Sequence, residues 1–215
     1  MYILTKENSI AGYFLAQLRD VNVQKDTMRF RRNLERLGEL LAYEISKTLP
    51  YETRKVQTPL AETTANLPVE FPVLATVLRA GLPFHHGFLN YFDASESAFV
   101  AAYRVERTAD LEVRVDYMTS VSLENKILLL VDPMLATGKS LALTYQAMLR
   151  FGTPRETHIA ACVASPEGIA HIQQELPNVK IWLGALDEKL NEHAYIIPGL
   201  GDAGNLAYGA KYSLP

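Results

Sequence analysis

Hydroxyl groups, a flexible glycine and one acidic residue gather in Lys126–Ser140, whose sequence is KILLLVDPMLATGKS. The acidic residue is Asp132, and the hydroxyls and the glycine fall within Ala136–Ser140. Backbone N–H groups at the start of a helix are unpaired, and together with the positive end of the helix dipole they bind anions. The pattern therefore predicts a phosphate-binding loop. The acidic residue before the loop indicates that the anion carries a sugar or a metal.

The residues around the loop indicate how it is positioned. Ile127–Val131 is a run of branched apolar residues, which is typical of a strand buried on both faces of a parallel sheet. Pro133 ends that strand because proline has no N–H to donate and restricts the residue before it. Leu141–Phe151 is predicted to be a helix that ends at Gly152. The loop would then connect the end of a buried strand to the start of a helix.

Two classes of protein use such a loop, and an ordinary βα connection is the plain alternative. A P-loop needs GxxxxGK[ST], and Gly138-Lys139-Ser140 matches its second half. The first glycine would fall at Pro133, which can neither adopt the glycine conformation nor donate an N–H, so a nucleoside triphosphatase is disfavoured. VDPMLATGKS closely resembles the motif with which phosphoribosyltransferases hold a ribose 5-phosphate. Many of these enzymes have a second acidic residue directly after the first. The proline at that position, Pro133, makes the motif resemble the uracil phosphoribosyltransferase branch in particular.

The bulk properties are those of one globular domain. A length of 215 residues can bury a substantial core, and we expect a single domain over residues 1–215. The net charge of −3 gives no general reason to expect nucleic acid or an anionic membrane as a partner. No stretch approaches the roughly 18 apolar residues of a membrane span, and the first ten residues do not resemble a signal peptide. The single Cys162 rules out an internal disulfide and favours a cytoplasmic location. It lies in the apolar run Ile159–Ala164 and is predicted to be a buried structural thiol and not a nucleophile.

Helical periodicity dominates the N-terminal part, at about residues 9–49. Ser9–Val21 is predicted to be one amphipathic helix, and Met28–Leu49 a second, with Thr27 as its cap and Pro50 after its end. Positive charge concentrates in the first half of the second helix, at Arg29, Arg31, Arg32 and Arg36. This charge is either a solvated face or a site for an anionic effector or a subunit contact.

The core, at about residues 70–187, alternates buried strands with helices. Strands are predicted at 72–78, 98–103, 127–131, 157–164 and 179–186, and helices at 83–91, 141–151 and 166–176. Ser165 is predicted to cap the last helix, with Pro166 as its first residue. Tyr51–Pro59 is predicted to be a strand or an arm, Thr58–Pro68 a surface loop, and Leu111–Tyr117 an exposed strand of a hairpin flap. These patterns predict an α/β fold in which helices cover both faces of a parallel sheet.

Charged residues follow several of these strands. Arg79, Arg104 and Asp132 each lie at the carboxyl end of a predicted strand, as does the Ala136–Ser140 loop. Ligands of such sheets bind at this edge, so these groups are expected to converge on one crevice.

The C-terminal stretch at about residues 191–209 reads NEHAYIIPGLGDAGNLAYG. It has four glycines and one proline and no period that fits a helix. Its apolar part, Tyr195–Pro198, is expected to pack against the rest of the protein. YIIPGLGDAG resembles the uracil-recognition segment of uracil phosphoribosyltransferases. VLRAGL at 77–82 is similar to that family's pyrophosphate-side loop, and AYR at 102–104 to its second arginine.

This resemblance implies a type I phosphoribosyltransferase-like fold with a hairpin flap and a C-terminal base-binding segment. It also implies a reaction, in which uracil and 5-phosphoribosyl 1-diphosphate give UMP and diphosphate. Arg79 and Arg104 would bind the diphosphate and, with Asp202, form the catalytic set, while Asp132 would contact the ribose hydroxyls. The uracil site would be formed by Ile196, Gly201, Asp202 and Ala203. The implied phosphoribosyl diphosphate site comprises Arg79, Arg104, Asp132, Pro133, Met134, Leu135, Ala136, Thr137, Gly138, Lys139, Ser140 and Asp202.

Further expectations follow from the same resemblance. Mg²⁺ would bind mainly through the substrate diphosphate, with no direct protein ligand assigned. A homodimer or higher homo-oligomer is expected, and GTP is a candidate effector. Two places depart from the family pattern: Lys139, where a small residue is common, and Glu106-Arg107-Thr108 after the second arginine. A regulatory relative that keeps the fold and binds RNA is the alternative, and the arginine cluster is its only support.

Overall fold

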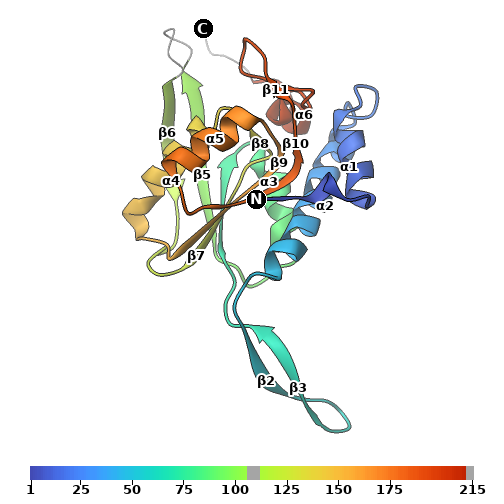
Figure 1. Ribbon diagram of the computed structural model, residues 1–215, viewed down its shortest axis with the longest axis vertical. Helices are drawn as coiled ribbons and strands as arrows, with labels where there is room; N and C mark the ends of the chain where they lie inside the picture. The colour runs from blue at the N-terminus through green and yellow to red at the C-terminus, as the bar shows by residue number, and fades with distance from the viewer. Residues whose placement is uncertain (106–111, 212–215) are drawn as a thin grey trace.

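The computed structural model describes residues 1–105 and 112–211, and only the backbone within 102–105 and 112–116. Its centre is one mixed sheet with the strand order β1-β10-β9-β7-β4-β5-β6, to which β8 adds by pairing with β9 (Figure 1). The strands pair in parallel except for β5 and β6, which are antiparallel. Their bounds are β1 Tyr2–Ile3, β4 Val73–Leu78, β5 Ser97–Val105, β6 Glu112–Thr119, β7 Ile127–Val131, β8 Met134–Leu135, β9 Glu156–Ala164 and β10 Lys180–Leu186.

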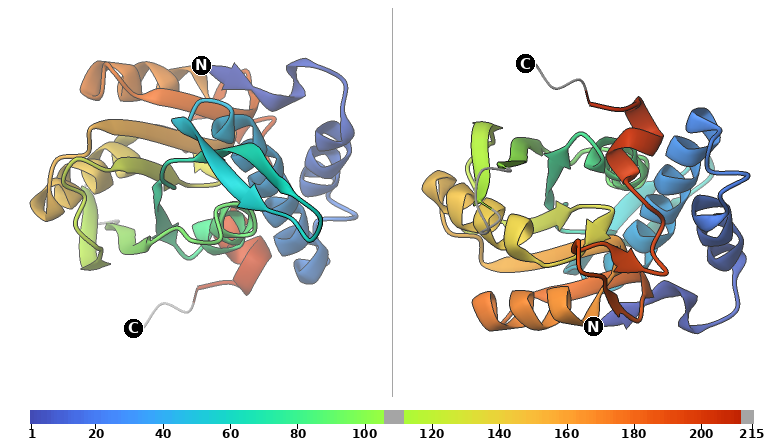
Figure 2. Two further views of the ribbon diagram at one scale, coloured as in Figure 1. Left: turned by 90° about the horizontal axis from the view of Figure 1, so that it is seen from below. Right: turned by 90° about the horizontal axis from the view of Figure 1, so that it is seen from above.

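Helices cover both faces of this sheet, as the sequence predicted. Figure 2 shows α1 and α2, in blue, across the sheet from α4 and α5, in yellow and orange. The helices are α1 Ile10–Arg19, α2 Thr27–Ser46, α3 Gly81–Leu89, α4 Lys139–Met148 and α5 Pro166–Glu175, with short 3-10 turns η1 Leu4–Lys6 and η2 Leu149–Phe151. The fold class is therefore confirmed, with the antiparallel β6 as the predicted hairpin partner at the sheet edge.

The position of strand β7 between two hydrophobic cores explains why its sequence is an unbroken apolar run. Ile127, Leu129 and Val131 point into the core beneath α1, α2 and α3. Leu128 and Leu130 point into the core beneath α4 and α5. Successive side chains of a strand alternate between its faces, so a strand covered on both faces needs apolar residues at every position.

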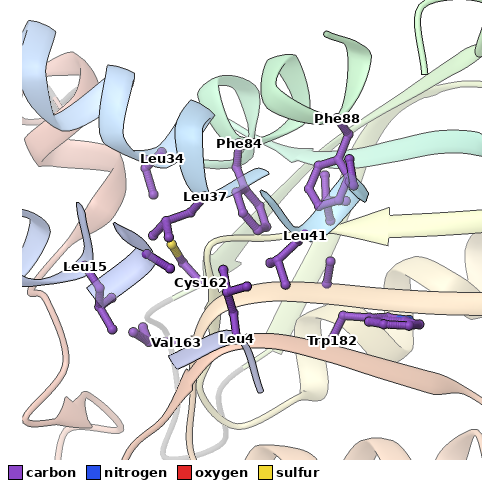
Figure 3. Packing of buried hydrophobic residues seen from close by; sticks show 14 of the residues in the cluster. Leu4, Leu15, Leu34, Leu37, Leu41, Phe84, Phe88, Cys162, Val163 and Trp182 are labelled. Atoms are coloured by element: carbon purple, nitrogen blue, oxygen red, sulfur yellow. The ribbon is translucent and has the colours of Figure 1, made fainter. Parts of the chain in front are cut away.

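The larger core is formed by α2 and α3 against the sheet. Leu34, Leu37 and Phe84 lie together in it, and Figure 3 shows Cys162 of β9 among them. Cys162 is a free, fully buried cysteine, and burial raises the pKa of its thiol. This environment suits a structural residue and not a nucleophile, as the sequence predicted.

The stretch from residue 51 to 68 differs from the prediction. Thr58–Pro68 was expected to be a surface loop, but Glu62–Pro68 forms strand β3 and pairs antiparallel with β2, Tyr51–Gln57. The hairpin projects away from the body of the protein (Figure 1). Strand β2 agrees with the predicted strand or arm at Tyr51–Pro59. Most side chains of β3 are exposed, so no apolar alternation marks it as a strand, and backbone hydrogen bonds to β2 form it.

The C-terminal stretch also contains regular structure that was not predicted. Strand β12, Ile196–Ile197, pairs with β11, Lys189–Leu190, and Ala203–Tyr208 forms helix α6. A helix of six residues is too short to show a period, although its N-cap Asp202 is a recognisable start signal. The segment packs onto the larger core through Ile196, Leu200 and Ala203. Within Tyr195–Pro198, which was expected to pack against the protein, Ile196 is buried, whereas Tyr195 is 45% exposed.

Two smaller differences occur at the ends of elements. Helix α2 is capped by Asp26, whose side chain accepts from the Arg29 N–H at 3.0 Å, and the predicted cap Thr27 is its first residue. Strand β1 was not predicted, because two residues are too few to show a pattern.

Within residues 1–105 and 112–211, no helix combines the length and the apolar composition that a membrane span requires.

Candidate active site

A cleft of about 570 Å³ lies at the carboxyl ends of β4 and β7, where the sheet topology predicts a ligand site. Three segments far apart in the sequence form it: the loop after β4, the loop between β7 and α4, and the C-terminal segment around α6. The lining residues are Val77, Leu78, Arg79, Ala80, Asp132, Met134, Leu135, Ala136, Thr137, Gly138, Ser140, Leu141, Ala194, Tyr195, Gly201, Asp202, Ala203, Gly204 and Lys211.

The predicted phosphate loop contributes one end of the cleft. Gly138 is the N-cap of α4 and has a φ of 75°, which L-residues with a side chain rarely adopt. A Cβ on Gly138 would lie 2.8 Å from the Gly168 carbonyl oxygen, so a close approach to α5 also requires glycine. The loop thus presents the start of a ten-residue helix to the cleft, with Thr137 and Ser140 beside it.

Helix α5 supports the phosphate loop through Ser165. The Ser165 hydroxyl donates to the Ala136 carbonyl at 2.7 Å and accepts from the Gly168 N–H at 3.0 Å. Ser165 is fully buried and is the N-cap of α5, the role that the sequence predicted for it. One side chain therefore satisfies the helix and fixes the loop.

Pro133 fixes the same loop to the sheet. It is buried, and its carbonyl accepts from the N–H groups of Cys162 and Val163 at 3.1 and 3.0 Å. Asp132 comes directly after β7 and lines the cleft, and its Oδ1 accepts from the Met134 N–H at 3.1 Å. The backbone around the acidic residue is thus held from both sides.

Arg79 lies in the cleft against the C-terminal segment. Its Nη2 donates to the Gly209 carbonyl at 3.2 Å and to Asn205 Oδ1 at 3.4 Å. Its Nε is buried and has no hydrogen-bond partner among the described residues. A buried guanidinium donor without a partner is costly, and an anionic ligand in the cleft would satisfy it.

Asp202 and its neighbours form the C-terminal wall of the cleft. Asp202 is exposed and caps α6, since its Oδ1 accepts from the Asn205 N–H at 2.9 Å. Gly201 is exposed with a φ of 86°, and Ala203 is almost fully buried. The main chain at Gly201 and Asp202 is therefore accessible from the cleft, while the buried Ala203 attaches the segment to the core.

Four predicted site residues are not placed in the cleft. Pro133 is buried behind the loop, and Ile196 is buried in the core with 3 % exposure. Lys139 is exposed and lines a separate hollow between α4 and α5. The backbone of Arg104 belongs to β5, but its side chain lies outside the described part, as do residues 106–108. Their binding roles stay predictions.

Several cleft residues were missed by the sequence reasoning. Tyr195 and Ala194 line the cleft, as do Leu78 and Ala80 beside Arg79. Lys211 adds a cation that no motif indicated. The signal for Tyr195 was its place in the apolar YIIP run, whereas position alone in the folded chain brings Lys211 to the cleft.

The acidic groups of the cleft are few. Asp132 and Asp202 are its carboxylates among the described residues. No group of three or more His, Cys, Asp or Glu side chains in the described part could hold a metal ion by itself.

Comparisons with known proteins agree with this arrangement. A family model described as "Uracil phosphoribosyltransferase" matches residues 5–210. A protein of Porphyromonas gingivalis with that name is 50% identical over 210 residues, which are 97% of this chain and 97% of the relative. A protein of Pyrococcus furiosus with the same name is 37% identical and covers 91% of this chain and 84% of its own length.

A solved structure shares the fold over nearly the whole chain. The AQ2163 protein from Aquifex aeolicus superposes with a TM-score of 0.85 at 31% identity and covers 96% of this chain and 98% of its own. The sequence match, the shared fold and the cleft at the carboxyl edge of the sheet agree with one another. This chain belongs to the uracil phosphoribosyltransferase family.

Proposed function

We propose that this protein transfers the 5-phosphoribosyl group of 5-phosphoribosyl 1-diphosphate to uracil, giving UMP and diphosphate. The observation that carries the proposal is the convergence of three segments on one cleft: the helix-capping loop 136–140, the Arg79 loop, and the 201–203 main chain. They offer an anion cradle, a guanidinium and a neutral hydrogen-bonding wall. These three features match the 5-phosphate, the diphosphate and the base of the two substrates.

The phosphoribosyl diphosphate is held at both ends. The backbone N–H groups of residues 137–140 and the α4 dipole bind the 5-phosphate. Asp132, at the end of β7, accepts hydrogen bonds from the ribose hydroxyls. Arg79 binds diphosphate oxygens, and Arg104 is proposed as a second arginine on the family resemblance. A guanidinium binds phosphate oxygens in pairs, which lysine cannot do.

The chemistry requires stabilisation of the leaving group. The bond between C1 of the ribose and the diphosphate oxygen breaks, and a bond from C1 to N1 of uracil forms. Negative charge develops on the leaving oxygens, and fixed guanidiniums stabilise it in the transition state. The N1 proton of uracil leaves to Asp202 or to water. Diphosphate and UMP then account for all the atoms of the two substrates.

Magnesium fits this site as a companion of the substrate. Asp132 and Asp202 supply carboxylate oxygens in the cleft, the ligand type that Mg²⁺ prefers, directly or through water. When bound, the ion would neutralise charge on the diphosphate and assist its departure. The proposed binding is mainly through substrate oxygens.

Main-chain groups select the base. Uracil has an N3–H donor between two carbonyl acceptors, and the backbone C=O and N–H groups at 201–203 can match that pattern. Cytosine reverses donor and acceptor at N3 and at the 4-position. It would leave buried groups unpaired at about 1–3 kcal/mol each. Purines are excluded by their size.

One assay tests this function. The purified protein is incubated with 5-phosphoribosyl 1-diphosphate, Mg²⁺ and one base at a time: uracil, cytosine, hypoxanthine or orotate. We expect UMP from uracil and no nucleotide above background from the other three. Absence of UMP, or equal use of cytosine, would contradict the proposal. A chelator should abolish turnover, and added Mg²⁺ should restore it.

The RNA-binding alternative gains no support from the arginine cluster. Arg32 pairs with Glu35 and Glu39, at 2.8 and 3.1 Å. Arg31 donates to the Ala207 carbonyl at 2.7 Å, and the Arg36 guanidinium lies over the ring of Phe14. These arginines are engaged within the protein and do not form a free basic face.

A homodimer or higher homo-oligomer in the cytoplasm is also proposed. The projecting β2–β3 hairpin supports self-association, since Leu60 at its tip is 96% exposed. GTP as an effector rests on the family resemblance, and adding GTP to the same assay tests it.

A further inference from the structure

A bidentate ion pair joins the first helix to the C-terminal segment. Arg19 is the last residue of α1, and Asp187 follows β10 directly. Arg19 Nη2 donates to Asp187 Oδ1 at 2.6 Å, and Nη1 donates to Oδ2 at 3.0 Å. The Asp187 side chain is 4% exposed and that of Arg19 22%. Two parallel charge-assisted hydrogen bonds fix both distance and orientation, which a single contact would not.

The same two side chains hold the main chain of Gly199. The Gly199 N–H donates to Asp187 Oδ2 at 2.9 Å, and the Gly199 carbonyl accepts from Arg19 Nη1 at 3.2 Å. Gly199 has a φ of 62°, and a Cβ there would lie 2.1 Å from the Ile196 carbonyl oxygen. Only glycine fits this position. We call this group the Gly199 clamp; it consists of Arg19, Asp187 and Gly199.

A further contact holds the next residue. The side-chain amide of Gln24 donates to the Leu200 carbonyl at 3.3 Å and to the Leu18 carbonyl at 2.8 Å. Leu200 itself is 2% exposed in the core. Two consecutive residues, Gly199 and Leu200, are therefore attached to the end of α1 and to the turn after it, just before the chain enters the cleft at Gly201.

The clamp lies outside the cleft but fixes the residues that enter it. Among the described residues, Gly201, Asp202 and Ala203 line the cleft, and Arg19, Asp187 and Gly199 do not. Gly201 is conformationally permissive, and it keeps its φ of 86° because the chain is held before it at Gly199 and Leu200 and after it by the buried Ala203. A main-chain group cannot change rotamer as a side chain can. If the main chain is displaced, its hydrogen bonds to the base are therefore displaced with it.

We propose that Arg19 and Asp187 are positioning residues for uracil, which act through Gly199 on the main chain at 201–203. The inference rests on the proposed assignment of that segment to the base. A displacement of about 1 Å at a binding group can cost on the order of a hundredfold in rate. The clamp would therefore act mainly on the base, because the proposed contacts to the 5-phosphate and the ribose come from residues 136–140 and Asp132, which belong to another segment.

Steady-state kinetics with each substrate varied in turn test the proposal. Arg19→Lys keeps the charge and loses the fork, and Asp187→Asn keeps the shape and an acceptor for the Gly199 N–H. We expect each variant to raise the KM for uracil about tenfold or more. The KM for 5-phosphoribosyl 1-diphosphate should stay within about twofold, and the preference for uracil over cytosine should fall.

A matched control is available at the opposite edge of the sheet. Arg155 lies just before β9, and Glu70 lies just before β4. The Arg155 guanidinium pairs with both carboxylate oxygens of Glu70. Arg155→Lys removes the same fork from the same kind of pair. It should lower the melting temperature without separating the two KM values, because it stabilises the fold only.

Three results would overturn the proposal. One is a lower melting temperature in the Arg19 and Asp187 variants with an unchanged KM for uracil, and another is an equal rise in both KM values. The third concerns Gly201→Ala, measured alongside, which alters the main chain at 201–203 directly because alanine rarely adopts a φ of 86°. If Gly201→Ala raises the KM for uracil and the clamp variants do not, only the positioning role falls. If Gly201→Ala and the clamp variants all leave it unchanged, the assignment of 201–203 to uracil falls as well.

Discussion

Arg79 donates from Nη2 to the main-chain carbonyl of Gly209 at 3.2 Å, although 130 positions of sequence separate the two residues. The contact joins the loop after β4 to the end of the C-terminal segment. The diphosphate side and the base side of the proposed site therefore touch each other. Arg79 Nε has no hydrogen-bond partner within the described part of the chain, so this guanidinium still has a donor to offer to a ligand.

Arg79→Ala should lower kcat by about a hundredfold or more, because it removes charge stabilisation of the departing diphosphate. Arg79→Lys should recover part of the loss, since it restores the charge without the fork. Initial rates at saturating substrates measure both variants. Arg150 is an exposed arginine stacked on Phe151 and provides the control. Arg150→Ala should keep the full rate, and an unchanged rate in Arg79→Ala would show that Arg79 does not bind diphosphate.

Gly138→Ala should destabilise the protein and weaken binding of the 5-phosphate. Alanine at a φ of 75° costs about 1–2 kcal/mol, and its Cβ would press on the Gly168 carbonyl. The expected results are a lower unfolding free energy in guanidinium chloride and a higher KM for 5-phosphoribosyl 1-diphosphate.

Gly12 gives the matched control for that substitution. It lies within α1, and an added Cβ would meet no described atom within 4 Å. Gly12→Ala should raise the unfolding free energy by about 0.5–1 kcal/mol, because glycine loses more backbone entropy than alanine in a helix. If Gly138→Ala and Gly12→Ala changed the unfolding free energy alike, the requirement for glycine at position 138 would be disproved.

Ser165→Ala should couple a loss of stability to a loss of substrate binding. It leaves the buried Gly168 N–H without its acceptor and the Ala136 carbonyl without its donor, at a cost of about 1–3 kcal/mol. Thermal unfolding and the KM for 5-phosphoribosyl 1-diphosphate are the measurements. Ser46, whose hydroxyl only contacts the exposed end of α2, is the control. A higher melting temperature in Ser165→Ala would refute the supporting role.

His85 should make the stability depend on pH. It is fully buried next to Phe99, and neither ring nitrogen has a partner of normal hydrogen-bond geometry in the described chain. Burial, and then the neighbouring His86, lower its pKa to about 4, while the Leu74 backbone acts weakly in the opposite direction. In the unfolded chain the pKa returns to about 6.5, so the unfolded state binds the proton first as the pH falls.

The contribution of His85 is therefore fully present above about pH 6.5 and is lost as the pH falls towards 4. The loss reaches about 3 kcal/mol, since one pKa unit corresponds to about 1.4 kcal/mol. Denaturant unfolding at pH 7.5 and pH 5 measures it, and His85→Leu should remove most of the difference. The exposed His193 is the control. Parallel pH dependence in the protein and in His85→Leu would exclude this role.

The β2–β3 hairpin should matter for assembly and not for folding of the body. Leu60 at its tip is 96% exposed, and Leu60→Glu would place a charge where an apolar contact is proposed. We expect sedimentation velocity to show a smaller species at micromolar concentration, with an unchanged circular dichroism spectrum. Thr63→Glu, on the exposed face of the same hairpin, is the control. A monomer in the unaltered protein would contradict the proposed oligomer.

Local sequence was sufficient where the signal is local. The apolar run Ile127–Val131 predicted a strand with the observed bounds, because a strand buried on both faces needs apolar residues throughout. Ser165 and Pro166 predicted the start of α5, since a cap and a first-turn proline are local devices. The loop between that strand and α4 was located for the same reason, and its binding of phosphate stays a prediction. Strand β2 was predicted as a strand or an arm. Strand β3 and helix α6 were missed, because an exposed strand and a six-residue helix carry no periodic signal.

The sequence by itself determined the alternation of buried strands and helices, and hence which residues lie at the carboxyl edge of a sheet. Only the tertiary structure decided which of them meet. It brought Arg79 against Gly209 and Lys211 into the cleft, and it placed Ile196 in the core and Lys139 on the outside. It also joined Arg19 to Asp187 across 168 positions. Contacts between distant segments depend on strand order and on the path of the connections, which no local pattern encodes.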